Sequence, residues 1–466
     1  MPTESDWIQL SRALDPWREL PLDDSADALF VEVPYSPSVA VVRRLRAWHR
    51  GTRGGGSKEA APKFLYCGAR GGGKTTQLRR LVRELTGECE VLFLDLATVL
   101  PDQVSTLHLL THIGLALIAR LGQWEGADGG VSRVLTGPDG KGFASVLGRL
   151  VEGADLEAVV SAIAPLVSAA VPAVAGPVTS ATTVIKAIRD VLPGAKELDP
   201  LQRLSRTEKF LRRLAGNELE EARVLALEVS RLADALHGRA AKPVVMLADG
   251  LDKVLTLDGV LGAFDDIDLL RRVSCPVVLT APASLSSDVR FIGLRPDIIP
   301  LDLQNIPVVN ADGTERIEHV DRMVAIATKR MTPALRAMVT DEALHDAAVW
   351  SSGLPRDFLS FLNDAALVAE EESAPSVTRL HVRQITKEFR LRMQKPLTEQ
   401  DLGLLNRVLQ TRRLPENDRA QLLLFQNIIA WYPNEHGYFR PHELLADWVA
   451  GESARLAGLN LDPPRA

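Results

Sequence analysis

The 466-residue sequence predicts an α/β fold, in which a parallel sheet has helices on both faces and is followed by a helical region. Two observations support this prediction. Short apolar runs alternate with amphipathic helical patterns in the first part of the chain, which is the order that βαβ units require. Beyond residue 315 the pattern is helical until an aromatic hairpin near the end. A chain of this length exceeds one compact core, so we expect several domains.

The composition is that of a folded protein, because 46% of the residues are hydrophobic and 24% are charged. The net charge of −6 excludes a polycation built for nucleic acid, so only a local basic patch could serve that role. The three cysteines, Cys67, Cys89 and Cys275, lie in apolar runs and exclude a disulfide framework. The first ten residues lack the pattern of a secretory signal. We therefore expect a cytoplasmic protein.

The first predicted elements follow an acidic, proline-containing stretch, residues 1–30, which we expect to be irregular. A short helical pattern begins after Pro37, and residues 50–63 are rich in Gly and Ser like a surface linker. Apolar runs and helical spacing then alternate along the chain. These strands and helices are predicted at residues 64–67, 74–85, 89–96 and 104–121.

A long insertion, residues 123–240, precedes the third strand, which is predicted at residues 242–248. Its first part, 123–155, is Gly-rich and predicted to be a loop, and its last part is predicted to be an amphipathic helix. Its middle part, 158–185, has no charged side chain and is long enough to span a bilayer. However, prolines interrupt it and it lacks aromatic and basic flanks, so we favour a packed insertion or a partner-binding element over a membrane span.

Two more strands are predicted at residues 276–280 and 298–303, and helices then form a small bundle. The bundle helices are predicted at residues 315–331, 341–350 and 355–370. Thr398 and Asp401 have the spacing of a capping box and open the next helix. A helix, an aromatic hairpin and a last helix follow, which is a winged-helix order. These three elements are predicted at residues 416–429, 428–439 and 443–456.

Residues 68–75, GARGGGKT, match the phosphate-loop pattern G-x-x-x-x-G-K-[ST] between a predicted strand and a predicted helix. The glycines let backbone N–H groups turn around phosphate oxygens, and the helix N-terminus adds its positive dipole end. Lys74 is expected at the β- and γ-phosphates, and the Thr75 hydroxyl at Mg²⁺. The expected nucleotide-binding residues here are Gly68, Ala69, Arg70, Gly71, Gly72, Gly73, Lys74, Thr75 and Thr76. The sequence thus predicts a P-loop fold that binds ATP or ADP with Mg²⁺.

The apolar strand VVMLAD, residues 244–249, complements this loop because it ends in an acid at the carboxyl edge of the sheet. We expect Asp249 to coordinate Mg²⁺, directly or through water. Asp252 is expected to position or deprotonate the attacking water. The alternative interpretation is that Asp252 caps the next helix.

These motifs resemble those of STAND-type P-loop ATPases, in the wider AAA+ group and close to the NACHT and KAP branches. The resemblance covers residues 34–450. In that family the acid-bearing strand is followed by Asp-Gly-x-Asp and usually by Glu or Arg. Residues 249–252 match this pattern, and Lys253 departs from it. Since a lysine cannot be the base here, Asp252 is the candidate, and the resemblance implies slow hydrolysis with the nucleotide acting mainly as a switch.

The resemblance also implies roles for residues outside these two motifs. Thr280 stands where the family senses the γ-phosphate, although a simple strand-end hydroxyl is the alternative interpretation. Arg290 and Arg295 stand where an arginine finger is presented to a neighbouring subunit, with solvated surface arginines as the alternative. Residues 31–37 occupy the place that usually contacts adenine.

Two further implied contacts come from the helical region and the hairpin. Residues 353–356, GLPR, resemble the Gly-x-Pro motif at the head of the lid helix. Pro355 suits the first helical turn, and Arg356 is expected at the phosphates. His442 corresponds to the winged-helix histidine that reaches the phosphates. A structural turn and a structural histidine are the alternative interpretations.

The domain boundaries predicted on this basis are an N-terminal extension (1–33), an ATPase core (34–310), a helical lid (311–395) and a winged helix (396–466). The resemblance implies that ATP and ADP hold lid and winged helix in different arrangements, one of which assembles into homo-oligomers. We see no second enzyme domain or repeat array in the sequence, so a separate effector or trigger protein is expected. The family analogy suggests bacterial antiphage defence or stress signalling.

Two other hypotheses remain open at this point. The first is an origin-initiator-like AAA+ ATPase that acts on DNA through its winged helix, supported by the basic run 379–395 and opposed by the acidic net charge. The second is a scaffold that binds nucleotide for stability without turnover, supported by Lys253. Nucleic acid is the less favoured partner, and a membrane is disfavoured.

Overall fold

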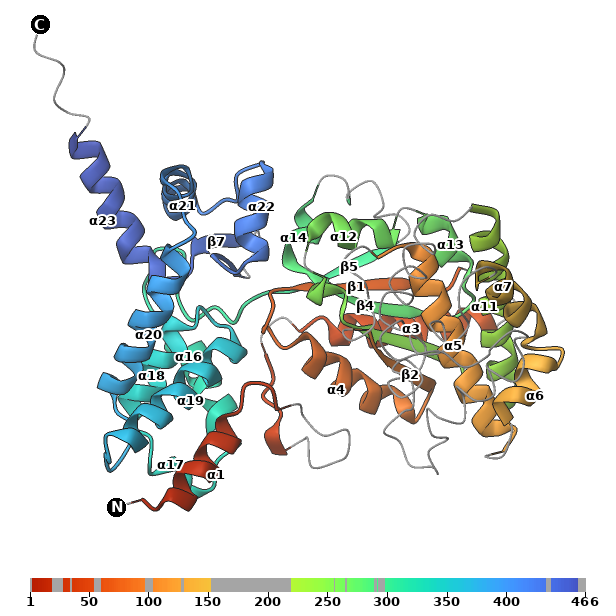
Figure 1. Ribbon diagram of the computed structural model, residues 1–466, viewed down its shortest axis with the longest axis horizontal. Helices are drawn as coiled ribbons and strands as arrows, with labels where there is room; N and C mark the ends of the chain where they lie inside the picture. Colours follow the sequence, from red (N-terminus) through yellow and green to blue (C-terminus); the bar gives the residue numbers. More distant parts are fainter. Residues whose placement is uncertain are drawn as a thin grey trace, which may run out of the picture. The chain divides into compact units, whose positions relative to one another are not determined.

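The computed structural model describes residues 2–18, 28–33, 36–53, 60–96, 104–126, 130–151, 219–254, 256–264, 266–288, 291, 298–432 and 437–459. The chain divides into two compact units, whose elements are labelled in Figure 1. The sheet unit comprises Pro37–Cys67 and Gln77–Leu301. The lid unit comprises Met1–Ser36, Gly68–Thr76 and Asp302–Ala466, so the phosphate-loop residues group with the helical lid and the winged helix.

The sheet has five strands in the order β2-β3-β4-β1-β5. These strands are β1 (Lys63–Gly68), β2 (Glu90–Asp95), β3 (Val244–Asp249), β4 (Val277–Pro282) and β5 (Ile299–Leu303). Strands β2, β3 and β4 pair in parallel, with Asp95 opposite Asp249 at the carboxyl edge. The predicted α/β fold with a parallel sheet is confirmed.

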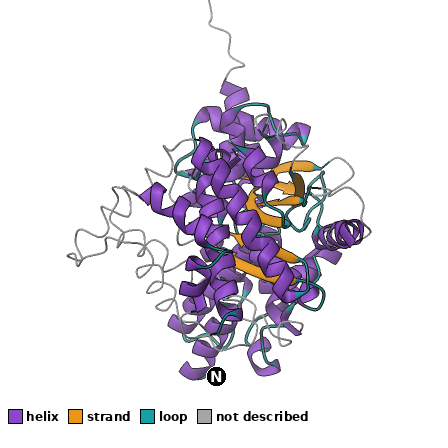
Figure 2. Ribbon diagram, turned by 90° about the vertical axis from the view of Figure 1, so that its right-hand side faces the viewer, coloured by secondary structure: helices purple, strands orange, loops and turns teal. Residues whose placement is uncertain are grey.

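Helices cover both faces of this sheet, and Figure 2 shows the strands in orange among them. On one face, α5 (Thr106–Trp124) and α11 (Leu219–Ala240) share a buried cluster with every second strand residue, such as Leu92 and Met246. On the other face, α3 (Ser38–Arg53) and α4 (Lys74–Thr86) meet Tyr66 of β1. Ser38 Oγ lies 2.9 Å from Tyr66 Oη and donates to Gln77 Oε1 at 3.1 Å.

The beginning of the insertion is helical, so the prediction of a loop over residues 123–155 is wrong. The structure has α6 (Gly130–Thr136) and α7 (Lys141–Val151) there. The glycines that suggested a loop serve close helix packing: a Cβ on Gly130 of α6 would lie 2.0 Å from Gly122 O of α5, and one on Gly142 of α7 would lie 2.0 Å from Glu228 Oε2 of α11. The predicted amphipathic helix is α11, whereas the charge-free segment 158–185 lies outside the described residues.

The N-terminal stretch is also more regular than predicted, because it contains α1 (Glu4–Leu14). Thr3 and Asp6 form a capping box, in which Asp6 Oδ2 accepts from Thr3 N at 2.8 Å and Thr3 Oγ1 accepts from Asp6 N at 3.3 Å. The apolar face of α1 is buried in the lid cluster. Likewise, α3 extends to Arg53, so the predicted linker 50–63 starts as helix.

Buried Lys63 ties the start of β1 to the turn that precedes β4. Its Nζ donates to the carbonyl oxygens of Ala61 (2.9 Å), Val273 (2.9 Å) and Cys275 (3.0 Å). Burial lowers the pKa of Lys63 to about 8. The remaining short elements of the sheet unit are η1 (Leu251–Lys253), α12 (Leu257–Leu261), η2 (Gly262–Phe264), α13 (Ile267–Arg272) and α14 (Ala283–Ser287).

The helical lid is a bundle packed around aromatic and aliphatic side chains of its longest helix, including Phe358, Phe361 and Leu362. Its helices are α16 (Ile317–Thr328), α17 (Pro333–Arg336), α18 (Asp341–Trp350), α19 (Pro355–Glu371) and α20 (Arg379–Gln394). No helix in the described part of the chain combines the length and the apolar character that crossing a bilayer requires.

The winged helix contains the elements in the predicted order. They are α21 (Glu399–Thr411), α22 (Asp418–Phe425), β6 (Ile429–Tyr432), β7 (Tyr438–Pro441) and α23 (Glu443–Leu459). The capping box of Thr398 and Asp401 is confirmed. Helix α22 ends at Phe425, earlier than predicted, because the chain from Ile429 onward pairs with β7 as an antiparallel strand.

Replacing Asp401 by asparagine is expected to destabilise the winged helix by about 1–2 kcal/mol at pH 7. Arg419 donates to both carboxylate oxygens, at 2.6 and 2.7 Å, and chiefly for that reason the pKa of Asp401 falls from 3.8 to about 2. Because the pKa of Asp401 is lower in the folded state than in the unfolded state, its carboxylate adds stability above pH 3.8, and this stability is lost as the pH falls toward 2. Urea unfolding at several pH values should therefore show the wild-type advantage shrinking below pH 4, and an advantage that is constant with pH would contradict this assignment.

Candidate functional site

The phosphate loop links the end of β1 to the first residue of α4, as the motif predicts. Gly71 and Gly73 have φ values of +81° and +92°, which glycine adopts without strain. Gly72 N donates to Ala69 O at 3.1 Å and closes the turn. Buried Lys74 donates through Nζ to the carbonyl oxygens of Gly68 (2.8 Å) and Ala69 (2.7 Å). The glycine conformations and the buried ammonium fit a phosphate cradle.

Lid helix α19 begins directly against this loop. Pro355 occupies its first turn, as predicted, and Arg356 N donates to Gly71 O at 3.2 Å. A Cβ on Gly71 would lie 2.7 Å from Arg356 Cβ, so the close approach of the lid also requires glycine at position 71. The lid thus contacts the backbone of the loop itself.

The winged helix contacts the same loop one residue earlier. Asn427 Nδ2 donates to Arg70 O at 2.9 Å, and Arg70 Cζ lies 4.8 Å from the centroid of the Phe425 ring. Because C=O and the following N–H point in opposite directions across a trans peptide, this bond also orients the N–H of Gly71. No sequence motif predicts this contact, since Arg70 and Asn427 are far apart along the chain.

The GLPR turn has a structural role in addition to placing Arg356. Gly353 has φ +71°, and its carbonyl accepts a hydrogen bond from Ile306 N at 3.1 Å. A Cβ at this position would lie only 1.8 Å from Ile306 O. The turn therefore fixes the start of α19 to the chain that follows β5.

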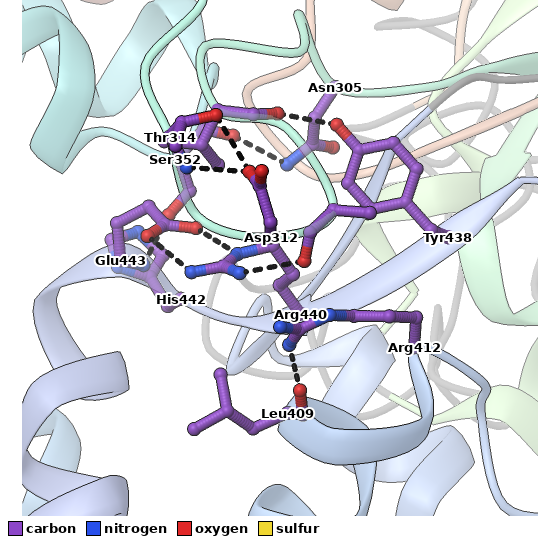
Figure 3. Close-up of polar contacts among 12 residues, drawn as sticks. Asn305, Asp312, Thr314, Ser352, Leu409, Arg412, Tyr438, Arg440, His442 and Glu443 are labelled. Carbon is purple, nitrogen blue, oxygen red and sulfur yellow. Dashed lines mark hydrogen bonds and ion pairs between the residues drawn. The ribbon is translucent and has the colours of Figure 1, made fainter.

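His442 is fully buried beside the start of α19, where its Nε2 lies 3.8 Å from Asp357 Oδ2. Figure 3 shows the polar contacts around it, which anchor the hairpin. Arg440 Nε donates to Glu443 Oε1 at 2.8 Å, its Nη1 donates to Ala311 O at 3.2 Å, and Glu443 N donates to Ser352 Oγ at 2.7 Å. His442 itself accepts from Leu444 N through Nδ1 at 3.4 Å and donates through its backbone N to Ile428 O at 2.8 Å. Its own contacts therefore give His442 a structural position, and its contact with phosphates remains a prediction.

The acid-bearing half of the predicted site belongs to the sheet unit. Asp249 ends β3 and is buried, Asp95 lies opposite it on β2, and Leu96 N donates to Asp249 O at 2.7 Å. Burial lowers the pKa of the nearby Arg79 guanidinium, whereas the charges of Asp249 and Asp95 raise it. Asp95 and Arg79 are not among the site residues predicted from the sequence. A sequence signal exists for Asp95, because β2 ends in an acid as β3 does.

The Thr280 hydroxyl joins the backbone after β3 to the carboxylate of Asp252. It accepts from Gly250 N at 2.8 Å and donates to Asp252 Oδ1 at 3.2 Å. Asp252 is buried inside η1, whereas the next helix is capped by Thr256, whose hydroxyl accepts from Gly259 N at 3.1 Å. The alternative interpretation of Asp252 as the cap of that helix is therefore wrong.

Several predicted site residues are not brought together by what the structure describes. Arg290 and Arg295 lie outside the described residues, as do two of the residues in 31–37. Thr75 belongs to the lid unit and Asp249 to the sheet unit. Their joint Mg²⁺ site therefore remains a prediction.

The phosphate loop between β1 and α4, on a five-stranded sheet with helices on both faces, decides the fold class. The chain has a P-loop α/β fold. No family model and no curated protein matches its sequence.

Solved structures give distant matches along most of the chain. Drosophila ORC bound to DNA is 12% identical, with 97% of this chain and 93% of that chain covered and a TM-score of 0.34. The Aeropyrum pernix ORC1 protein in complex with DNA is 13% identical, with coverages of 96% and 98% and a TM-score of 0.35. Cdc6p from Pyrobaculum aerophilum is 13% identical, with coverages of 94% and 99% and a TM-score of 0.33. At these TM-scores the likeness adds no argument to the fold assignment, which rests on the strand order and the loop.

Proposed function

We propose that this protein is an ATP-binding and ATP-hydrolysing switch, in which the nucleotide state of the phosphate loop sets the arrangement of lid and winged helix. One observation carries the proposal: both domains bond to the backbone of the loop, Arg356 to Gly71 O and Asn427 to Arg70 O. A ligand that reorients these peptides changes both contacts. It can shift the equilibrium between two arrangements by its difference in affinity for them.

The chemistry follows from the residues at the loop and at the acidic edge. In this proposal Lys74 binds the β- and γ-phosphates, and Thr75 and Asp249 hold Mg²⁺, which neutralises developing phosphoryl charge. Asp252, oriented by Thr280, positions and deprotonates the attacking water. Lys253 in place of the family's Glu or Arg argues for slow turnover, and Arg290 or Arg295 is the proposed finger toward a neighbouring subunit.

The finer assignment is a STAND-type ATPase of the NACHT and KAP branches, based on residues 249–252. On that assignment the four predicted domains act as one switch that assembles into homo-oligomers and controls a separate effector. Bacterial antiphage defence or stress signalling is the proposed setting, by analogy with the family.

Mass photometry of the protein alone, with ADP and with ATP plus Mg²⁺, tests this function. We expect ATP to drive the wild type into a defined oligomer, whereas Lys74→Ala stays small under all three conditions because its loop cannot hold the triphosphate. An unchanged mass of the wild type in every nucleotide would show that nucleotide alone does not drive assembly.

The second candidate function is an initiator-like ATPase that acts on DNA, favoured by the basic helix α20 before the winged helix. Part of that charge is used internally, since Arg379 Nε donates to Asp346 Oδ2 at 2.5 Å and Arg392 lies over the Phe389 ring. DNA binding that weakens steeply with salt would favour this candidate. Tight ADP retention without phosphate release would instead favour a nucleotide-stabilised scaffold.

A further inference from the structure

An exposed tryptophan of the N-terminal segment stacks on the lid arginine next to the phosphate loop. Trp17 is 70% exposed, and Arg356 Cζ lies 4.3 Å from the centroid of its ring. The backbone N–H of the same arginine donates to Gly71 O, and its Cβ lies against Gly71. Trp17, Arg356 and the loop therefore form one continuous set of contacts within the lid unit.

Helix α1 and the turn after it fix the position of this indole. The apolar face of α1 shares a buried cluster with α19, and Ser11 Oγ donates to Asn363 Oδ1 at 2.8 Å. After the helix, Asp15 Oδ1 accepts from Trp17 N at 2.9 Å, and Asp15 O accepts from Arg330 Nη1 at 3.1 Å. Helix α1 packs through its buried apolar face, whereas Trp17 follows the helix and is exposed. Burial in a core therefore does not explain why Trp17 is placed at the arginine.

The way in which Arg356 is held leaves its charge available. Among the described residues, the contact recorded for its guanidinium is the Trp17 ring rather than a carboxylate. A cation–π contact occupies the flat face of the guanidinium, whereas its N–H donors lie in the plane and point outward at the edge. A carboxylate partner would occupy those donors and would repel an incoming anion. A neutral indole fixes the side chain without either effect.

We propose that Trp17 is a positioning residue that holds the Arg356 guanidinium ready for the phosphate groups of a nucleotide at the loop. This inference rests on the nucleotide-binding function proposed above. The indole restricts the rotamers of a long side chain before the ligand arrives, so less conformational entropy is lost when the guanidinium meets a phosphate oxygen. The N-terminal segment thereby becomes part of the nucleotide site.

Isothermal titration of ATP and ADP with Mg²⁺ into full-length variants tests the proposal. Trp17→Leu is expected to weaken ATP binding about two- to fivefold, the range of an exposed cation–π contact. Trp17→Phe keeps an aromatic face and should recover most of the loss. Trp124→Leu is the matched control, since Trp124 is a half-exposed tryptophan of α5 in the sheet unit, and it should bind as the wild type does. All three variants should keep the wild-type melting temperature.

A double-mutant cycle with Arg356→Met decides whether Trp17 acts through the arginine. We expect Trp17→Leu to have no further effect on ATP binding in that background. A full effect that persists there, or wild-type ATP affinity in Trp17→Leu, would overturn the positioning role while leaving the nucleotide function intact. A wild-type protein that binds neither ATP nor ADP would instead overturn the proposed function, and this inference with it.

Discussion

Replacing Lys74 by alanine is expected to lower the affinity for ATP with Mg²⁺ about a hundredfold, or about 3 kcal/mol. The Lys74 ammonium is buried within the loop and donates to the carbonyl oxygens of Gly68 and Ala69. When a triphosphate occupies the loop, this charge is the donor best placed to face the β- and γ-phosphates. Alanine removes those charge-assisted hydrogen bonds and also leaves the two loop carbonyls without their donor.

Isothermal titration measures this loss directly, with Lys141→Ala as the control because Lys141 is an exposed lysine of α7. Circular dichroism should show that both variants remain folded, since Lys74 makes its recorded hydrogen bonds to the loop rather than to the core. An ATP affinity of Lys74→Ala within threefold of the wild type would refute the assignment of residues 68–75 as the phosphate site.

The sheet and the winged helix could be predicted because their signals are local. Strands β1 to β5 are short, mostly apolar runs between polar segments, so their positions are readable without knowledge of their neighbours. The phosphate loop is a contiguous motif with defined flanks, and the Thr398–Asp401 box starts α21 by itself. In each case the residues that determine the structure lie within a few positions of one another.

The glycines of the insertion were misleading because glycine has two uses. In a loop it supplies conformational freedom, but at Gly142 it lets α7 approach α11 closely, with the Glu228 carboxylate in the space that a side chain would take. Only the packing of the helices distinguishes these uses. For the same reason α6 and α7 were predicted as loop although Val134 and Leu147 are buried core residues.

The contacts that carry the proposed switch could not be predicted, because they join distant parts of the sequence. Trp17 meets Arg356, and Asn427 meets Arg70, without any shared periodicity or motif. The same holds for Thr280 within β4, whose hydroxyl donates to Asp252. Motifs identified the groups that could bind phosphate, and tertiary packing determined which residues position them.

Replacing Asp252 by asparagine is expected to lower kcat for ATP hydrolysis about 10²- to 10⁴-fold while the ATP affinity stays within about threefold of the wild type. Asparagine keeps an oxygen that can accept from Thr280 Oγ1, so the geometry of the site is retained. It cannot take up a proton from water at neutral pH. The change therefore separates nucleotide binding, which the proposal assigns to the loop, from hydrolysis, which it assigns to Asp252.

Steady-state phosphate release at saturating ATP and Mg²⁺ measures the effect, and Asp268→Asn is the matched control because the Asp268 carboxylate on α13 is exposed. Thr280→Val removes the hydroxyl that orients Asp252, so it should lower kcat by a smaller factor and leave ATP binding unchanged. An Asp252→Asn protein with wild-type kcat would place the base elsewhere, and Asp249 and Asp95 at the ends of β3 and β2 are the next candidates. If instead turnover is absent in the wild type and ATP still drives assembly, the protein switches on nucleotide binding alone, and the catalytic role proposed for Asp252 is wrong.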